Sequence, residues 1–201
     1  FEYSNLYFDT PENICLNDHI RERKNKYKVR IRSYVNSNIC FLEIKKKNVH
    51  GRTIKMRIQR TSEKWDSPLT DSEKGFLSER VPFASELSPV LYISYSRFTL
   101  AQLNRGERIT LDTDLTYTTI QGEISKPLKG LVVVELKQEE TDRRSPLFVF
   151  LRSMPERTTQ LGRIIKISKY VLGRLSSDDS LSTRTYLSKL KVLRRATKAI
   201  K

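Results

Sequence analysis

The feature that most constrains the fold is a two-residue alternation of charged and apolar side chains that recurs in several segments. In residues 27–34, YKVRIRSY, three cations alternate with two aliphatic residues. Side chains of an extended strand point alternately to its two faces, so Lys28, Arg30 and Arg32 share one face. The segment therefore predicts a strand with one charged face and one apolar face.

Four further segments divide in the same way. Their charged faces carry Glu43 and Lys45, Lys55 and Arg57, Arg108 with Asp112 and Asp114, and Glu135 with Lys137. The predicted strands are residues 1–10, 27–34, 40–47, 52–60, 107–118 and 130–138, separated by turn residues such as 36–38 and 50–51. Adjacent antiparallel strands of this kind tend to close into a barrel.

Helical patterns are fewer and cover residues 72–81, 145–154, 168–175 and 180–201. Ser145 is typical of a helix N-cap, with Pro146 in the first helical position. The predicted fold class is therefore α+β, an antiparallel β-barrel that forms a tunnel with a few flanking helices. We expect one domain over residues 1–173 and a basic tail over 174–201 that is helical or partly disordered.

The charge balance favours a polyanionic partner. The chain has 38 Lys and Arg against 23 Asp and Glu, a formal net charge of +15. Its two cysteines follow no metal-binding spacing, and no apolar run reaches the length of a membrane span. We expect a cytoplasmic protein, in which segments outside this chain can provide contacts with a membrane or a partner.

Periodicity leaves open which face of the strands is inside. In one interpretation the apolar side covers the core and the charged side faces water, as in many antiparallel sheets. In the other, the charges point into a barrel and helices cover its apolar outside. Unpaired buried ions cost several kcal/mol each, so such a lumen has to be wet or filled by a multiply charged anion.

An ordered set of motifs decides between the two interpretations. The chain contains, in this order, SNLYFDTPEN, YKVRIRSY, FLEIKKK, RTIKMRI, SYSRFTL, ERITLDTDL, VVVELKQ and IIKISKYVLG. Over roughly residues 3–173 it resembles the VTC domain, the polyphosphate polymerase branch of the triphosphate tunnel metalloenzymes, including its bacterial members. The resemblance implies a barrel whose charged face lines a tunnel, with ATP, triphosphate or polyphosphate as ligand.

The resemblance also assigns residues, by their place in the motifs. It implies phosphate binding by Arg30, Arg32, Lys45, Lys55, Arg97, Arg108, Lys166, Ser168 and Lys169, with Lys28, Arg57 and Lys137 as further candidates. Glu135 matches the glutamate that holds Mn²⁺ or Mg²⁺. Arginine binds phosphate oxygens with a planar fork, and hard divalent cations prefer carboxylate and phosphate oxygens. Glu43, Asp112 and Asp114 are expected to be structural.

One departure from the family pattern keeps several functions open. The superfamily's first strand carries an E-x-E-x-K signature that is absent here, so that strand precedes Phe1 or one wall of the site is missing. The leading hypothesis is transfer of the ATP γ-phosphate to a polyphosphate chain with a divalent metal. The alternatives are a tripolyphosphatase or nucleoside triphosphatase and a non-catalytic polyphosphate-binding module. Specific nucleic-acid binding ranks last, because few aromatic residues lie between the cations.

Overall fold

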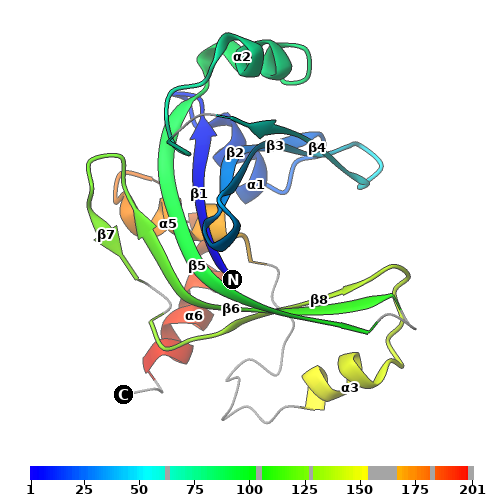
Figure 1. Cartoon of the computed structure of the whole chain (residues 1–201). Coiled ribbons are helices and arrows are strands. Elements are labelled where there is room, and N and C mark those ends of the chain that lie inside the picture. Colours follow the sequence, from blue (N-terminus) through cyan, green and yellow to red (C-terminus); the bar gives the residue numbers. More distant parts are fainter. Residues whose placement is uncertain (62–63, 103–105, 127–128, 154–166, 182–183, 199–201) are drawn as a thin grey trace.

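The centre of the molecule is a strongly curved antiparallel sheet of eight strands. A computed structural model describes the chain except residues 62–63, 103–105, 127–128, 154–166, 182–183 and 199–201. The strand order is β4-β3-β2-β1-β5-β6-β7, and β8 also pairs with β6. Figure 1 shows that β4 and β8 lie on opposite sides of an opening. The α+β class and the antiparallel sheet are confirmed, and the channel is open along one side in the part of the chain described.

The strands are β1 (Glu2–Asp9), β2 (Lys26–Tyr34), β3 (Ile39–Lys47), β4 (Thr53–Arg60), β5 (Ser88–Gln102), β6 (Glu107–Thr118), β7 (Ile124–Ser125) and β8 (Val133–Gln138). The helices are α1 (Ile14–Ile20), α2 (Asp71–Ser78), α3 (Pro146–Ser153), α5 (Lys169–Ser177) and α6 (Leu187–Lys198). Short 3₁₀ turns are η1 (Val35–Ser37), η2 (Ala84–Glu86) and η4 (Arg184–Tyr186). The six strands predicted from alternation correspond to β1, β2, β3, β4, β6 and β8.

The segment around α2 covers the outer face of the first half of the sheet. Thr70 and Glu73 form a capping box at the start of α2. The Glu73 carboxylate also forms an ion pair with Arg60 Nε on β4, at 2.7 Å, and both side chains are buried. Val29 and Ile31 are fully buried on this face of β2. Their apolar side is therefore outside the channel and covered, as the second interpretation requires.

Helices α1 and α5 pack on the inner side of the sheet instead. Asp9, at the end of β1, accepts bonds from the backbone N–H groups of Cys15 and Leu16 and so caps α1 across the intervening turn. The Tyr170 hydroxyl of α5 donates to the same carboxylate at 2.5 Å, and its ring stacks on Tyr7 with centroids 5.0 Å apart. The expectation that the helices cover the outside is therefore wrong for α1 and α5, which fill one end of the concave side.

The C-terminal segment is joined to the same core. The boundary expected after residue 173 lies inside α5, and Leu190 and Leu193 of α6 are buried. The outer face of the β5-β6-β8 half is less covered: Phe98 and Leu100 are 61% and 53% exposed. Among the helices that the structure describes, none is long and apolar enough to cross a membrane.

Candidate functional site

The register of β2, β3 and β4 gathers the cations of these three strands on the concave face. Arg30 lies opposite Glu43, and Lys28 lies opposite Lys45, across the β2–β3 pair. On β4, Lys55 is the partner of Lys45, and Arg57 is the partner of Glu43. Because cross-strand partners point to the same side of a sheet, these residues form one charged surface.

Glu43 is the anchor of this surface. Its carboxylate accepts Arg30 Nε at 2.8 Å and Nη2 at 2.7 Å, and it lies 3.9 Å from Arg32 Nε. Arg30 Nη1 also donates to the Tyr7 hydroxyl at 2.8 Å. Burial alone would raise the pKa of Glu43, but Arg30 and Arg32 outweigh it and lower that pKa. The structural role predicted for Glu43 is confirmed, since it holds the two arginines in place as a permanent anion.

Two neighbouring groups titrate near neutral pH because of this crowding. Burial, together with the charges of Lys45 and Arg30, lowers the pKa of Lys28 to about 8. Burial would raise the pKa of the Tyr7 hydroxyl, but Arg30 and Lys28 outweigh it and bring that pKa down to about 8. Burial is the largest cause for Lys28, whereas for Tyr7 the neighbouring cations overcome the effect of burial.

A second ion cluster joins helix α5 to the sheet. Asp112 on β6 is fully buried and accepts Arg97 Nε at 2.6 Å and Nη2 at 2.8 Å. Its other contact is Lys169 Nζ, at 2.6 Å, from the first turn of α5. The structural role predicted for Asp112 is thus confirmed. The cluster places Arg97 and Lys169, both predicted phosphate ligands, side by side.

Aromatic rings form the floor beneath this cluster. Arg97 lies over the rings of Tyr3 and Tyr95, at 5.4 and 5.2 Å from their centroids, and Lys169 lies 5.3 Å from that of Tyr95. Arg32 approaches Tyr3 in the same way and can donate to the Tyr95 hydroxyl at 3.4 Å. The sequence prediction missed both tyrosines. The available signal was the two-residue spacing, which puts Tyr3 on the same strand face as Asn5 and Tyr95 on the same face as Arg97.

The opposite wall of the cleft comes from β6 and β8. Arg108 is the cross-strand partner of Lys137, and the Glu135 carboxylate lies 3.6 Å from Lys137 Nζ. Burial and the charge of Arg30 lower the pKa of Lys45, while Glu135 acts in the opposite direction from across the cleft. Likewise burial lowers the pKa of Lys137, with Lys55 among the contributing charges. Side chains of the two walls therefore share one electrostatic environment.

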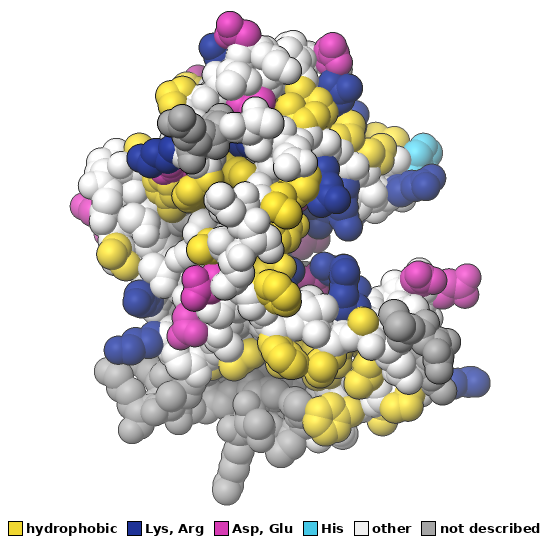
Figure 2. Space-filling view, viewed as in Figure 1, with side chains coloured by type: hydrophobic (Ala, Val, Ile, Leu, Met, Phe, Trp, Pro, Cys, Tyr) yellow, Lys and Arg dark blue, Asp and Glu magenta, His cyan; other side chains and the backbone are white. Residues whose placement is uncertain are grey.

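Figure 2 shows this cleft between the two walls, with Lys and Arg side chains on both sides of it. Ten described cations of the concave face line the cleft: Lys28, Arg30, Arg32, Lys45, Lys55, Arg57, Arg97, Arg108, Lys137 and Lys169. Three carboxylates face them, those of Glu43, Asp112 and Glu135. Such an excess of positive charge suits a ligand with several negative charges.

One predicted phosphate ligand, Ser168, has a different role in the structure. The Ser168 hydroxyl oxygen accepts the Val171 N–H at 3.3 Å and caps α5, and Ser168 lines a small cavity away from the cleft cations. Lys166 lies outside the described residues. The remaining predicted site residues are brought together on the concave face.

Metal binding has one candidate ligand in the cleft. Glu43 and Asp112 are occupied by arginine and lysine, so Glu135 is the carboxylate with the weakest internal pairing. The described residues contain no group of three or more His, Cys, Asp or Glu side chains placed to hold a metal. Mg²⁺ is commonly bound by one or two carboxylates together with substrate phosphates and water. Glu135 fits a divalent ion that is held jointly with a phosphate ligand.

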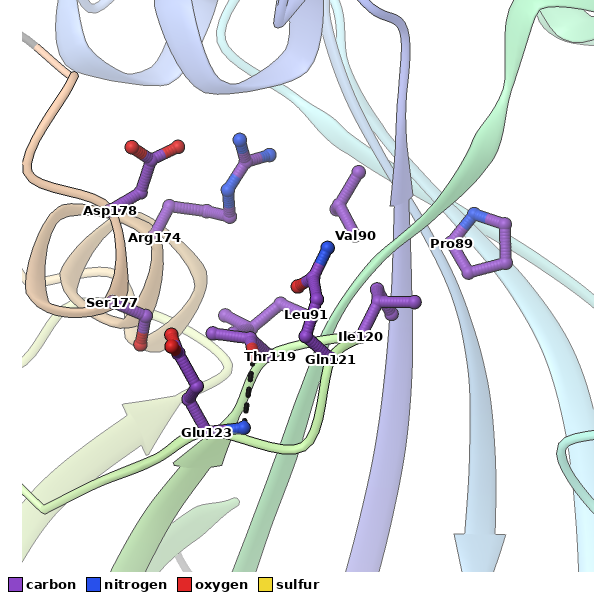
Figure 3. Close-up of a pocket in the computed structure, with 10 residues that line it drawn as sticks. All are labelled: Pro89, Val90, Leu91, Thr119, Ile120, Gln121, Glu123, Arg174, Ser177 and Asp178. Atoms are coloured by element: carbon purple, nitrogen blue, oxygen red, sulfur yellow. Dashed lines mark hydrogen bonds between the residues drawn. The ribbon is translucent and has the colours of Figure 1, made fainter.

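A cavity of about 340 Å³ lies elsewhere, between α5 and the turn that links β6 to β7. Figure 3 shows that it brings Arg174, Asp178 and Glu123 together with apolar side chains of β5. The Arg174 guanidinium is engaged away from it, by Asn13 Oδ1 at 2.6 Å. The charges around this cavity are mixed, and it shares no residue with the cleft.

Comparisons with known proteins support the same arrangement of motifs. The profile of the VTC domain family matches residues 1–177. No curated protein matches the chain. A solved candidate adenylate cyclase from Bacillus halodurans is 15% identical, with a TM-score of 0.48, and the match covers 84% of this chain and 79% of that one.

A second solved candidate adenylate cyclase, from Vibrio parahaemolyticus, is 13% identical, with a TM-score of 0.47 and coverage of 85% and 79%. The PH1819 protein of Pyrococcus horikoshii OT3 is 15% identical, with a TM-score of 0.35 and coverage of 80% and 83%.

Proposed function

The chain belongs to the VTC domain family of the triphosphate tunnel superfamily, and on this premise we propose that it transfers the γ-phosphoryl group of ATP to a polyphosphate chain. Proteins of this superfamily are typically phosphate-handling enzymes that bind nucleoside triphosphates or polyphosphate and generally use a divalent metal. The observation that carries the proposal is the cleft itself. Ten cations face three carboxylates there, and both walls contribute.

The proposed reaction needs little covalent chemistry from the protein. A terminal oxygen of the polyphosphate chain forms a bond to the γ-phosphorus, the bond to the β–γ bridging oxygen breaks, and ADP leaves with that oxygen. Catalysis of phosphoryl transfer rests mainly on positioning and on neutralising charge. Arg30 and Arg97 are held rigidly by carboxylates and suit positioning, while Lys45, Lys55 and Lys137 lack strong pairing and suit movable charge.

Mn²⁺ or Mg²⁺, held by Glu135 and the ligand's phosphates, would neutralise further negative charge there. The Lys137 ammonium next to Glu135 would contact the same phosphates. Expected partners are therefore ATP, triphosphate and polyphosphate.

The test is incubation of the chain with ATP and Mn²⁺, followed by gel electrophoresis of the products. We expect a phosphate polymer and ADP. Lys45→Gln should lower the rate at least tenfold, whereas Lys46→Gln should change it less than twofold, because Lys46 is on the opposite face, over the Tyr27 ring. Free phosphate as the sole product would contradict the polymerase and indicate hydrolysis.

One observation favours a second candidate, a polyphosphate-binding module without catalysis. The cleft has three described carboxylates, and two of them, Glu43 and Asp112, are paired with cations. Glu135 is then the one described carboxylate left to bind a metal there. Such a module would be stabilised by tripolyphosphate to the same extent with and without Mn²⁺, through preferential binding to the folded state. Metal-dependent turnover would exclude it.

A further inference from the structure

A second cationic cavity, of about 150 Å³, lies at the ends of β2 and β3, where α1, α5 and α6 meet the sheet. Its lining residues are His19, Glu22, Lys26, Lys47, Ile167, Ser168, Val171, Tyr186 and Lys189. None of the ten cleft cations lines it, although Lys26 and Lys47 lie on the same face of β2 and β3 as Lys28 and Lys45, nearer the ends of the strands.

Positive charge in this cavity is incompletely neutralised. Lys26 and Lys47 are cross-strand partners, and among the described residues neither is in an ion pair. Lys189 lies 3.3 Å from Glu22 Oε1. Burial, followed by the charge of Lys47, lowers the pKa of Lys26. Three ammonium groups thus line the cavity with one carboxylate, that of Glu22, while Asp18 also acts on Lys26.

His19 adds a neutral wall to the cavity. Its Nδ1 lies 2.8 Å from the Cys15 carbonyl oxygen, an arrangement that requires the proton on Nδ1. Burial, together with the charges of Lys28 and Lys26, lowers the pKa of His19 to about 3. The ring is therefore uncharged at neutral pH, and the charge of the cavity comes from its lysines.

Two hydroxyl groups of the cavity each accept one backbone hydrogen bond and keep a hydrogen to donate. The Tyr186 oxygen accepts the Ser168 N–H at 3.3 Å, and the Ser168 oxygen accepts the Val171 N–H at 3.3 Å. Each hydroxyl can still donate its own proton. Lysine ammonium groups and hydroxyl donors together are what an oxyanion requires.

We propose that this cavity is a second phosphoryl-binding site, separate from the cleft, that takes one dianionic group the size of orthophosphate. The group is either free orthophosphate or the terminal phosphoryl of a monoester. Lys26 and Lys47 supply its charge contacts, and Ser168 and Tyr186 donate to its oxygens. The site does not depend on polymerase activity in the cleft.

The test follows backbone amide signals of Ser168, Val171 and Lys26 by NMR while orthophosphate is added to the full chain. We expect saturable shifts at these amides. Lys26→Gln/Lys47→Gln should raise the dissociation constant at least tenfold. The matched control, Lys24→Gln/Lys46→Gln, removes the same charge outside the cavity and should change it less than twofold.

A cleft variant separates this site from the cleft. Lys55→Gln/Arg57→Gln should leave the shifts at Ser168 and Val171 unchanged. Loss of those shifts in the cleft variant would overturn the proposal, as would an equal effect of the cavity and control variants. Glycerol 3-phosphate distinguishes the sources: binding of both compounds supports a terminal phosphoryl site, binding of orthophosphate alone supports a free-anion site, and binding of neither refutes the proposal.

Discussion

Asp112→Asn should destabilise the protein strongly. The carboxylate is fully buried and accepts three charged hydrogen bonds, from two Arg97 nitrogens and Lys169 Nζ. Breaking a buried ion pair by removing one partner costs about 3–5 kcal/mol. The Arg97 and Lys169 side chains remain 13% and 18% exposed, so water relieves part of the loss. We therefore expect about 3 kcal/mol, or about 6–12 °C in the melting temperature of a chain of this size.

The assay is urea unfolding of wild type and variant, followed by circular dichroism. The matched control is Asp114→Asn, because Asp114 is exposed and has φ of +55°, a conformation that asparagine tolerates well. That variant should be within about 0.5 kcal/mol of wild type. A loss below about 1 kcal/mol for Asp112→Asn, or an equal loss in the control, would refute the ion-pair argument.

The same cluster predicts how the stability contributed by Asp112 changes with pH. Burial alone would raise the pKa of Asp112, but Arg97 and Lys169 outweigh it and lower that pKa below its ordinary value of 3.8. Its stabilisation is then complete above that ordinary value and is lost as the pH falls through the folded-state pKa. The stability difference between wild type and Asp112→Asn should therefore shrink when the pH is lowered below 3.8.

Other predictions concern packing and charge. Gly173→Ala should cost about 1–3 kcal/mol in thermal unfolding, because a Cβ there would lie 2.4 Å from a core tyrosine ring. Gly75→Ala, with open space around it inside α2, should instead stabilise by about 0.5–1 kcal/mol. Glu43→Gln should tighten tripolyphosphate binding several-fold in calorimetry, because two arginines lose their counter-ion. Tripolyphosphate binding should weaken as the pH rises through about 8, because Lys28 loses its proton there and Tyr7 becomes an anion. The double variant Tyr7→Phe/Lys28→Arg should abolish that dependence.

Strand faces were the most predictable part of this molecule. Charged and aliphatic residues alternate through the middle of β2 and β3, so each strand was placed with the correct sides. Alternation could not decide which side is concave, because that depends on strand order and curvature. The motif order supplied this information, and the position of Lys169 beside Asp112 agrees with it.

The elements that escaped prediction lack a periodic signal. Strand β5, residues 88–102, has apolar side chains on both faces around Val90–Ile93 and then serines, so it matches no simple alternation. Helix α1 has seven residues, and its cap is the Asp9 carboxylate, six and seven positions before the amides that it binds. Tyr3 and Tyr95 were given no role from the sequence, although their rings lie beneath Arg97 in the cleft.

The opening between β4 and β8 has a consequence for how a long ligand would be retained. A closed tube holds a polymer topologically, since the chain has to be threaded through an end and can leave only by sliding out. In the described part of this chain the channel is open along its side, so a polymer can be laid in and lifted out laterally. Retention between successive additions would then rest on charge alone, and added salt should shorten the products by increasing the frequency of release.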